Sequence, residues 1–176
     1  MEHFERFLGR LLLDRNITDL SQRAYVLATV KHETGGKWKP VYERYNGDPV
    51  EYFTGKYEGR ADLGNAEPGD GYRFRGRGRV QLTGRRNYDR LGERLGIDLI
   101  SNPDDVMDED VDYDIIALGM AEGLFTGKKL ADYIIPGGTV DLINARRIVN
   151  WTDKAAVIAG YARSYQSLLT SIRNSA

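Results

Sequence analysis

The sequence contains no cysteine, which excludes disulfide bonds, thiolate metal sites and cysteine catalysis. Histidine occurs only twice, and the glycines that follow His32-Glu33-Thr34 supply no second histidine for a His-Glu-x-x-His zinc site. No apolar run is long enough to span a membrane, and the chain start lacks the basic region and apolar stretch of a signal peptide. We therefore expect no metal site, no membrane insertion, and a protein that stays in the host cytoplasm until something else releases it to the cell wall.

The net charge of −1 predicts only weak attraction to DNA or to anionic membranes. The charges are nevertheless segregated along the chain. Eight arginines lie between Arg73 and Arg94, whereas eight acidic residues and no Lys or Arg lie between Asp98 and Asp114. Two interpretations stay open: the two blocks are solvated and partly face each other, or the arginines line a groove for a polymer that carries acidic groups.

Hydrophobic periodicity predicts a mostly helical chain of one domain. We expect helices at Phe4–Leu13, Leu20–Glu33, Gly84–Leu95, Asp110–Phe125, Leu130–Ile134 and Thr139–Val149, and a last helix after the Thr152-Asp153 cap. The core face predicted for that last helix consists of Val157, Tyr161, Tyr165, Leu168 and Ile172. Phe74 to Leu82 is expected to be extended or hairpin-like, and the helix from Asp110 is expected to be buried.

Residues 37 to 72 are rich in Gly, Pro, Asp, Asn and Tyr and show little periodicity, so they are predicted to form a loop region. A loop this long inside a small domain is usually functional. Five tyrosines fall in it: Tyr42, Tyr45, Tyr52, Tyr57 and Tyr72. Aromatic faces stack on the apolar faces of sugar rings, although ordinary packing explains such residues equally well.

Glu33 lies where the second predicted helix meets Gly35-Gly36. The C-terminal dipole of a helix disfavours negative charge, and apolar neighbours exclude water, so a carboxyl group there is suited to keep its proton. A glycosidase needs such an acid to protonate the leaving oxygen. The alternative is an exposed glutamate that pairs with Lys31 or Lys37.

The segment from Phe74 to Gly84 is rich in arginine and glycine, and its glycines allow the backbone to approach a ligand closely. Gln81, Thr83 and Asn87 follow at i, i+2 and i+6 across a predicted strand-to-helix turn, which can point them into one cleft. Thr83 is also predicted to cap the helix that starts at Gly84.

Together these segments resemble glycoside hydrolase family 19, the chitinase-like family that also includes phage lysis enzymes. The resemblance runs roughly from Tyr25 to Tyr165 and rests on His-Glu-Thr, an acidic loop residue, Gly-Arg-Gly-x-x-Gln-Leu-Thr and, at 146–150, Arg-Arg-Ile-Val-Asn. It implies a mostly α, lysozyme-like α+β bilobal helical domain with a short β-hairpin and a catalytic cleft.

The resemblance assigns the general acid to Glu33, the glutamate of His-Glu-Thr. Glu43 matches the position of the base in phage-type members, about ten residues after the acid. Glu58 is the strongest rival, because the plant-type spacing is longer, and Glu51 and Asp62 are further rivals on the same loop. An inverting hydrolase needs its two carboxyl groups roughly 6.5–9.5 Å apart, to leave room for a water.

Further roles follow from the same resemblance. Thr83 would hold the attacking water together with the base, Gln81 and Asn87 would bind the acetamido and hydroxyl groups of the sugar, and Asn150 would reach the substrate. His32 is expected to orient a neighbour or touch sugar. Two departures favour the compact phage-type branch: Trp151 replaces a glycine of plant enzymes, and Val157 stands where the family has an arginine.

The leading hypothesis is an endolysin-type glycoside hydrolase that cleaves β-1,4 bonds in peptidoglycan strands by an inverting acid/base mechanism. It requires no cofactor, and we expect a monomer in which residues 1–176 form a single catalytic domain without a separate cell-wall-binding module. The alternatives are a chitinase acting on chitin oligomers, a non-catalytic glycan-binding relative, and a nucleic-acid-binding helical domain. The near-zero net charge argues against the last of these.

Overall fold

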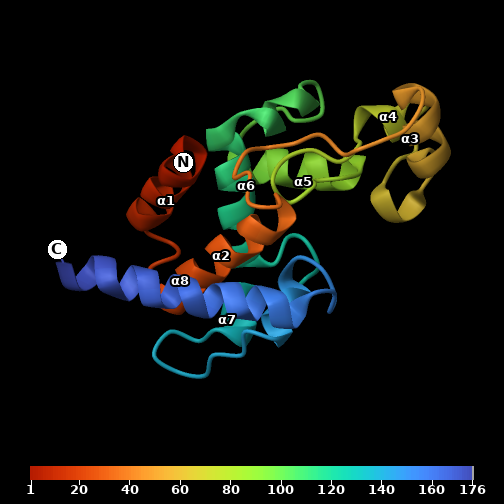
Figure 1. Ribbon diagram of the computed structural model, residues 1–176. Coiled ribbons are helices and arrows are strands. Elements are labelled where there is room, and N and C mark those ends of the chain that lie inside the picture. Colours follow the sequence, from red (N-terminus) through yellow and green to blue (C-terminus); the bar gives the residue numbers. More distant parts are fainter. Residues whose placement is uncertain (176) are drawn as a thin grey trace. The chain divides into compact units, whose positions relative to one another are not determined.

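The computed structural model describes residues 1–175 and is mostly helical, as the sequence predicts. Its α-helices are α1 Glu2–Leu13, α2 Leu20–Glu33, α3 Pro49–Tyr57, α4 Asp70–Arg73, α5 Arg85–Leu95, α6 Glu109–Glu122, α7 Leu130–Tyr133 and α8 Ala155–Ser175 (Figure 1). Three 3₁₀ turns are η1 Ala61–Leu63, η2 Pro103–Met107 and η3 Asn144–Ile148. None of the helices within residues 1–175 combines the length and the apolar content that a membrane span requires.

The chain folds as two compact units. Unit 2 is a continuous segment, Lys39–Ile115, whereas unit 1 combines Met1–Trp38 with the chain from Ile116 onward. The boundary between them falls inside α6, most of whose apolar residues are buried as expected. The single catalytic domain expected from the sequence stays a prediction.

Unit 1 is built around α2, which begins at its cap Asp19 and is apolar on nearly every face. The Asp19 side chain accepts hydrogen bonds from two backbone N–H groups of the first turn, as expected for a helix cap. A continuous run from Ala24 to Val30 is buried, so α2 needs neighbours on several sides. The longest of them is α8, which lies along α2 (Figure 1).

The core face predicted for α8 is wrong by about one residue. Val157, Leu168 and Ile172 are 45%, 40% and 37% exposed, and the buried residues are Ile158, Ala159, Ala162 and Leu169. The two alanines explain the difference, because small side chains let α8 approach the α2 backbone closely. The hydrophobic pattern of the sequence counted the large residues and overlooked the alanines.

Part of the region predicted as loop is helical. Within residues 37–72, α3 begins at Pro49 after Asp48, whose side chain accepts a hydrogen bond from the Glu51 N–H. The short α4 packs against α3. Conversely, the helix predicted at Thr139–Val149 is reduced to the 3₁₀ turn η3, and Val140 instead forms an isolated antiparallel bridge with Ile134.

The hairpin expected between Phe74 and Leu82 is very short. Arg77 and Leu82 exchange two backbone hydrogen bonds of 3.1 and 2.8 Å, and Arg77 also pairs with Tyr42. Gly78 makes the turn at a φ of +85°, and a Cβ there would lie 2.4 Å from Oδ1 of Asp112. The described residues contain only such isolated bridges and no longer strand.

The arginine block and the acidic block do meet, and the two arginines that form these contacts, Arg77 and Arg79, are buried rather than solvated. Arg79 is 1% exposed and pairs with Asp112 at 2.6 Å and with Glu109 at 3.0 Å. Arg77 is 2% exposed and pairs with Asp104 at 2.7 Å. These pairs fasten the segment 75–82 to η2 and the start of α6 inside unit 2.

Candidate active site

Glu33 is the last residue of α2, where the sequence places it. Thr34 follows, and its hydroxyl donates to the Val30 carbonyl at 2.8 Å, while Gly35 and Gly36 take positive φ values that end the helix. The Glu33 side chain is 21% exposed. A carboxyl group that is partly buried yet reachable is what a proton donor to a bound ligand requires.

The principal partner of Glu33 is Arg146, on the 3₁₀ turn η3. One of its terminal nitrogens donates to Glu33 Oε1 at 2.6 Å, and its Nε donates to the Asp153 carbonyl at 2.8 Å. The arginine is 2% exposed. A buried guanidinium stabilises the ionised form of a neighbouring carboxyl group, which opposes the effect of the helix end. Sequence reasoning quoted Arg146 within a motif but missed this contact, because the two residues lie far apart in the chain.

Tyr25 adds an unusual group to the same unit. Its ring is 1% exposed, and its hydroxyl has no hydrogen-bond partner within residues 1–175. Burial raises the pKa of this hydroxyl above its ordinary value, a shift that the Arg146 charge opposes and the Glu33 charge reinforces. The phenol therefore keeps its proton at neutral pH.

Glu43 is held by three hydrogen-bond donors. Lys56 Nζ lies 2.6 Å from Oε1, the Tyr57 hydroxyl lies 2.9 and 3.0 Å from the two oxygens, and the Gly76 N–H lies 3.1 Å from Oε2. The Glu43 side chain is 15% exposed. These donors, one of them a cation, fix the orientation of the carboxylate.

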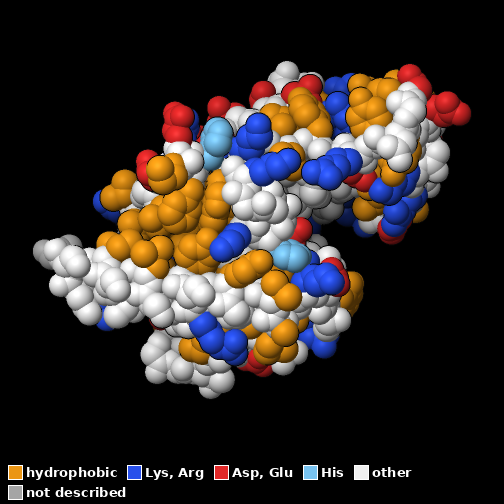
Figure 2. All heavy atoms as spheres, viewed as in Figure 1, with side chains coloured by type: hydrophobic (Ala, Val, Ile, Leu, Met, Phe, Trp, Pro, Cys, Tyr) orange, Lys and Arg blue, Asp and Glu red, His pale blue; other side chains and the backbone are white. Residues whose placement is uncertain are grey.

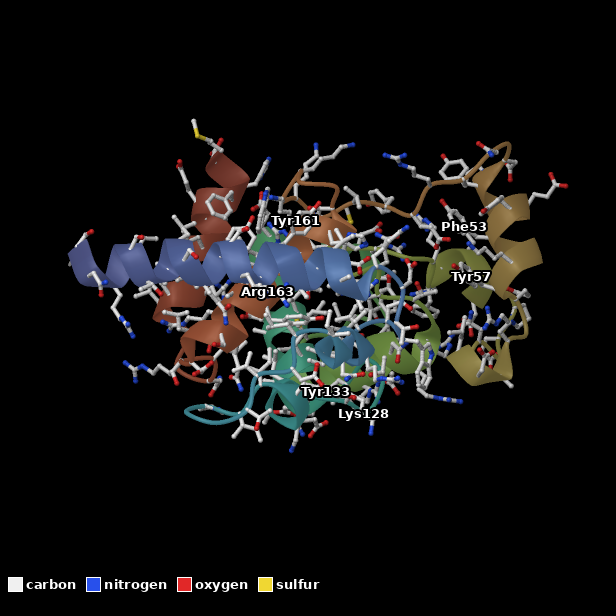
Figure 3. The ribbon with its side chains drawn as sticks, turned by 60° about the horizontal axis from the view of Figure 1, so that its bottom comes forward. Phe53, Tyr57, Lys128, Tyr133, Tyr161 and Arg163 are labelled. Carbon is white, nitrogen blue, oxygen red and sulfur yellow. The ribbon has the colours of Figure 1, made fainter. Side chains whose placement is uncertain are left out.

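The two side chains that donate to Glu43, Lys56 and Tyr57, both keep their protons at neutral pH. The hydrogen bond to Glu43 is the main cause that raises the pKa of Lys56, so the amine stays a cation at neutral pH. Burial first, and the bond to Glu43 second, raise the pKa of the Tyr57 phenol, which therefore keeps its proton. Figure 3 shows Tyr57 and Phe53 on one side of α3, and their rings stack at 6.2 Å with an interplanar angle of 6°.

Gly76 is where the backbone comes closest to Glu43. Its carbonyl accepts from the Glu43 N–H at 2.9 Å, and a Cβ at this position would lie 2.7 Å from Glu43 Oε2 and 2.9 Å from Gln81 Oε1. Only glycine allows the carboxylate and the segment 75–82 to approach this closely.

The rival acids have other partners. Each carboxylate oxygen of Glu58 accepts from a backbone N–H, Gly69 at 2.7 Å and Gly71 at 2.8 Å, which ties α3 to α4. Asp62 pairs with Arg60 in an exposed turn, and Glu51 is exposed in the first turn of α3. Their geometry favours Glu43 as the base, and the assignment itself stays a prediction.

Thr83 is not the helix cap that the sequence predicts. α5 begins at Arg85, whose N–H is bound instead by Asn65 Oδ1 at 2.9 Å, from 20 residues upstream. Gly84 takes a φ of +90° against Leu63, which turns the chain before the helix starts. The Thr83 hydroxyl donates to the Gln81 carbonyl at 3.0 Å, so its oxygen remains able to accept from a water.

Gln81 and Asn87 are both engaged inside unit 2. The Gln81 amide donates to the carbonyls of Val41 at 3.0 Å and Gly78 at 2.9 Å, and the Asn87 amide donates to the Thr83 carbonyl at 2.7 Å. The two side chains thus hold the loop around Thr83 in place. The Asn87 amide oxygen already accepts from Arg90 at 3.1 Å, so a predicted contact with sugar would share it, whereas that of Gln81 would use the Gln81 amide oxygen.

His32 and Asn150 belong to unit 1. His32 is half-buried beside Glu33, and Asn150 is exposed after η3, where its Oδ1 accepts from the Trp151 N–H at 2.9 Å. The structure therefore places Glu33, His32 and Asn150 in one unit and Glu43, Gln81, Thr83 and Asn87 in the other.

Comparisons with known proteins point to one family. Residues 15–121 match the profile of the glycoside hydrolase 19 family, described as chitinase class I. A glycosyl hydrolase family 19 domain-containing protein of Haemophilus influenzae is 32% identical, and the match covers 48% of this chain and 53% of that protein. A basic endochitinase of Vitis vinifera is 30% identical over 46% of this chain and 27% of its own length. The chain thus spans about half the length, or less, of these relatives.

The fold has a solved counterpart as well. A crystal structure of a mutant of chitinase C superposes with a TM-score of 0.54, at 21% sequence identity, and covers 87% of this chain and 72% of that one. At this identity the similarity shows the fold alone.

Proposed function

Because the chain belongs to glycoside hydrolase family 19, whose members are chitinase-like enzymes, we propose that it hydrolyses β-1,4 bonds in the glycan strands of peptidoglycan. The observation that carries the proposal is the environment of Glu43. Lys56, Tyr57 and the Gly76 N–H hold the two oxygens of this carboxylate in one orientation, as the positioning of a general base requires.

The reaction divides between two carboxyl groups. Glu33 gives its proton to the glycosidic oxygen as the bond to the anomeric carbon breaks, which leaves Glu33 ionised beside Arg146. The charge of Arg146 stabilises that product state, so the contact assists proton release. Before the next cycle Glu33 must take up a proton from solvent, and the base, which gains one from the attacking water, must release it to solvent.

The second half of the reaction concerns the water. Glu43 accepts a proton from a water whose oxygen attacks the anomeric carbon from the opposite face, so the configuration inverts. The Thr83 hydroxyl oxygen accepts the second proton of that water in a hydrogen bond. Lys56 and Tyr57 hold Glu43 in place throughout, since neither is free to accept the proton itself.

The proposed assignments are tested by Glu33→Gln and Glu43→Gln, with Glu51→Gln on the exposed side of α3 as the matched control. Each glutamine keeps the shape of its side chain and removes the ionisable group. We expect each of the first two variants to lose at least about 10³-fold in turnover of peptidoglycan with an unchanged circular dichroism spectrum, and the control to behave as wild type. Near-normal turnover in Glu33→Gln would contradict the proposal.

Peptidoglycan and chitin share their β-1,4 linkage and acetamido groups, so the choice between them needs a separate measurement. Arg73 and Arg75, which form no ion pair with a carboxylate of residues 1–175, support a substrate that carries negative charge. Mass spectrometry of digested peptidoglycan identifies the sugar that bears the new reducing end, and release of chitin oligomers measures the alternative. Faster hydrolysis of chitin oligomers than of peptidoglycan would identify a chitinase instead.

A further inference from the structure

A hollow of about 520 Å³ in unit 2 is lined by more positive than negative charge. Its charged residues are Arg73, Arg75, Arg77, Arg85, Asp70 and Asp104. The lining therefore carries two more positive than negative charges. In Figure 2, Lys and Arg side chains flank hydrophobic ones at the end of unit 2 that carries α3 and α4.

Two of the four arginines serve the fold. Arg85 binds both oxygens of the buried Asp70, at 2.8 and 2.6 Å, and Arg77 pairs with Asp104 at 2.7 Å. Arg77 is also bound to backbone carbonyls and to the Tyr88 hydroxyl. Their charges are neutralised, and their donors are largely used.

Arg73 and Arg75 differ from these two because their hydrogen-bond partners are neutral carbonyls; the Arg73 charge also helps to lower the pKa of the nearby Asp98. Arg73 donates through Nε and one terminal nitrogen to the carbonyls of Ile100 and Ser101, and Arg75 donates one terminal nitrogen to the Tyr72 carbonyl at 2.9 Å. No carboxylate within residues 1–175 pairs with either of them. Each guanidinium is therefore fixed in position with at least one donor nitrogen left over.

Aromatic contacts fix Arg75 further. Its guanidinium carbon lies 4.2 Å from the centre of the Tyr72 ring and 5.3 Å from that of Tyr42. Stacking of this kind orients the plane of the group without neutralising its charge. A guanidinium that is preorganised in this way loses little side-chain entropy when an oxyanion binds.

Successive residues of the segment 75–77 face opposite sides of the backbone, which places this hollow and Glu43 on different sides. Gly76 faces the Glu43 carboxylate, whereas the neighbouring Arg75 and Arg77 line the hollow. One short piece of backbone thus presents the predicted base on one face and the arginines on the other. A substituent or a neighbouring unit of a polymer bound at the base is what the hollow would receive.

We propose that this hollow binds an oxyanion group, a carboxylate or a phosphate, carried by the glycan strand or by a polymer attached to it. Arg73 and Arg75 supply the charge and the donor nitrogens. A planar guanidinium matches the oxygen spacing of a carboxylate and of a phosphate equally. The identity of the polymer rests on the proposed function, whereas the anion site does not. The strand's stem peptides carry carboxylates, as do lactyl groups that bear no peptide, and attached wall polymers carry phosphates.

The binding test follows the arginine Nε–H signals of the full chain by NMR at constant ionic strength. The probes are N-acetylmuramic acid, N-acetylglucosamine and inorganic phosphate; the first two differ in one lactyl carboxylate. We expect the Arg73 and Arg75 signals to shift with the two anions and not with the neutral sugar. A lower midpoint for phosphate identifies a phosphate source, and the reverse identifies a carboxylate source.

The functional test compares the double variant Arg73→Gln/Arg75→Gln with Arg86→Gln. Arg86 is a matched control, because it is exposed and donates only to the carbonyls of Ala61 and Asp62. We expect KM for peptidoglycan to rise roughly tenfold in the double variant, with kcat and the hydrolysis of neutral N-acetylglucosamine oligomers unchanged, and the charge-conserving Arg75→Lys to stay within about threefold of wild type.

Two results would overturn the inference: no shift of either arginine signal with either anion, or an equal loss on charged and neutral substrates in the double variant. Failure of the proposed function looks different. If the wild type cleaves neither peptidoglycan nor chitin oligomers, the hydrolase assignment fails, and the NMR titration still decides the anion site.

Discussion

Arg146 donates a 2.6 Å hydrogen bond to Glu33 across 113 residues of sequence. The arginine is itself fixed by the Asp153 carbonyl and is almost fully buried. The orientation of the predicted acid therefore depends on a turn, η3, that is far from it in the chain. It also places a positive charge beside the predicted acid.

Replacing Arg146 should impair catalysis more than stability alone explains. In Arg146→Gln the Glu33 carboxylate loses its orienting donor and the charge that stabilises it after proton transfer, so we expect kcat to fall about 10²-fold. The pH–rate profile should also change shape. Arg147→Gln, one position along the same turn, is the control. A profile that keeps its shape in Arg146→Gln would mean that the arginine is only structural.

Tyr57→Phe should separate the hydrogen bond to Glu43 from the packing of α3. The substitution keeps the ring that stacks on Phe53 and removes the hydroxyl that bonds both Glu43 oxygens. We expect kcat to fall about tenfold and the free energy of unfolding to fall by about 1 kcal/mol. Tyr52→Phe is the control, and kinetics plus urea unfolding measure both effects. Equal losses of activity in the two variants would contradict the role of Tyr57.

Asp112→Ala should be among the most destabilising substitutions in unit 2. It removes the carboxylate that neutralises the buried Arg79 and accepts from its N–H at 2.8 Å. Leaving a buried charge with one partner fewer costs about 3 kcal/mol, measured by urea unfolding. Asp105→Ala, at an exposed position of η2, should change stability by less than about 0.5 kcal/mol. A similar cost for the two variants would show that the buried pair is not what fastens this segment.

Asp70 should make stability depend on acid pH. Burial alone would raise the pKa of Asp70, but the hydrogen bonds from Arg85 and from the Glu67 N–H outweigh it and hold the pKa below 3.8. Since the folded pKa is the lower one, the contribution is complete above the unfolded value and is lost as pH falls through the folded value. Below pH 4, unfolding free energy should therefore decline less steeply in Asp70→Asn than in Asp105→Asn. Parallel declines in the two variants would count against the Asp70–Arg85 pair.

The sequence predicts most of the helices, because their signals are local. Asp19 caps α2, glycines end it at Glu33, and Gly96 ends α5. The predictions fail where distant residues decide. The N–H of Arg85 is bound by Asn65 rather than by Thr83. The buried face of α8 is the one that carries Ala159 and Ala162. Neither effect has a signature in a local window.

In the candidate site, too, local sequence signals predict some residues, and contacts between distant residues escape prediction. Glu33 and Glu43 were named from motif and spacing, and both have the partly buried settings that acid/base chemistry needs. Their partners were not predicted, since Lys56 and Arg146 are ordinary residues in sequence and acquire meaning only through tertiary contacts. Asp48-Pro49 is a local signal for the start of α3, although the composition of the surrounding segment predicts a loop.

Because unit 1 consists of two separate stretches of the chain, its second stretch is synthesised only after the whole of unit 2. A ribosome completes the whole of Lys39–Ile115 before it makes η3 or α8, so unit 2 is available to fold first on the nascent chain. Glu33 emerges early but waits for Arg146 and for the helix that covers α2. A translation product truncated ahead of η3 would carry the predicted acid without the guanidinium that orients it.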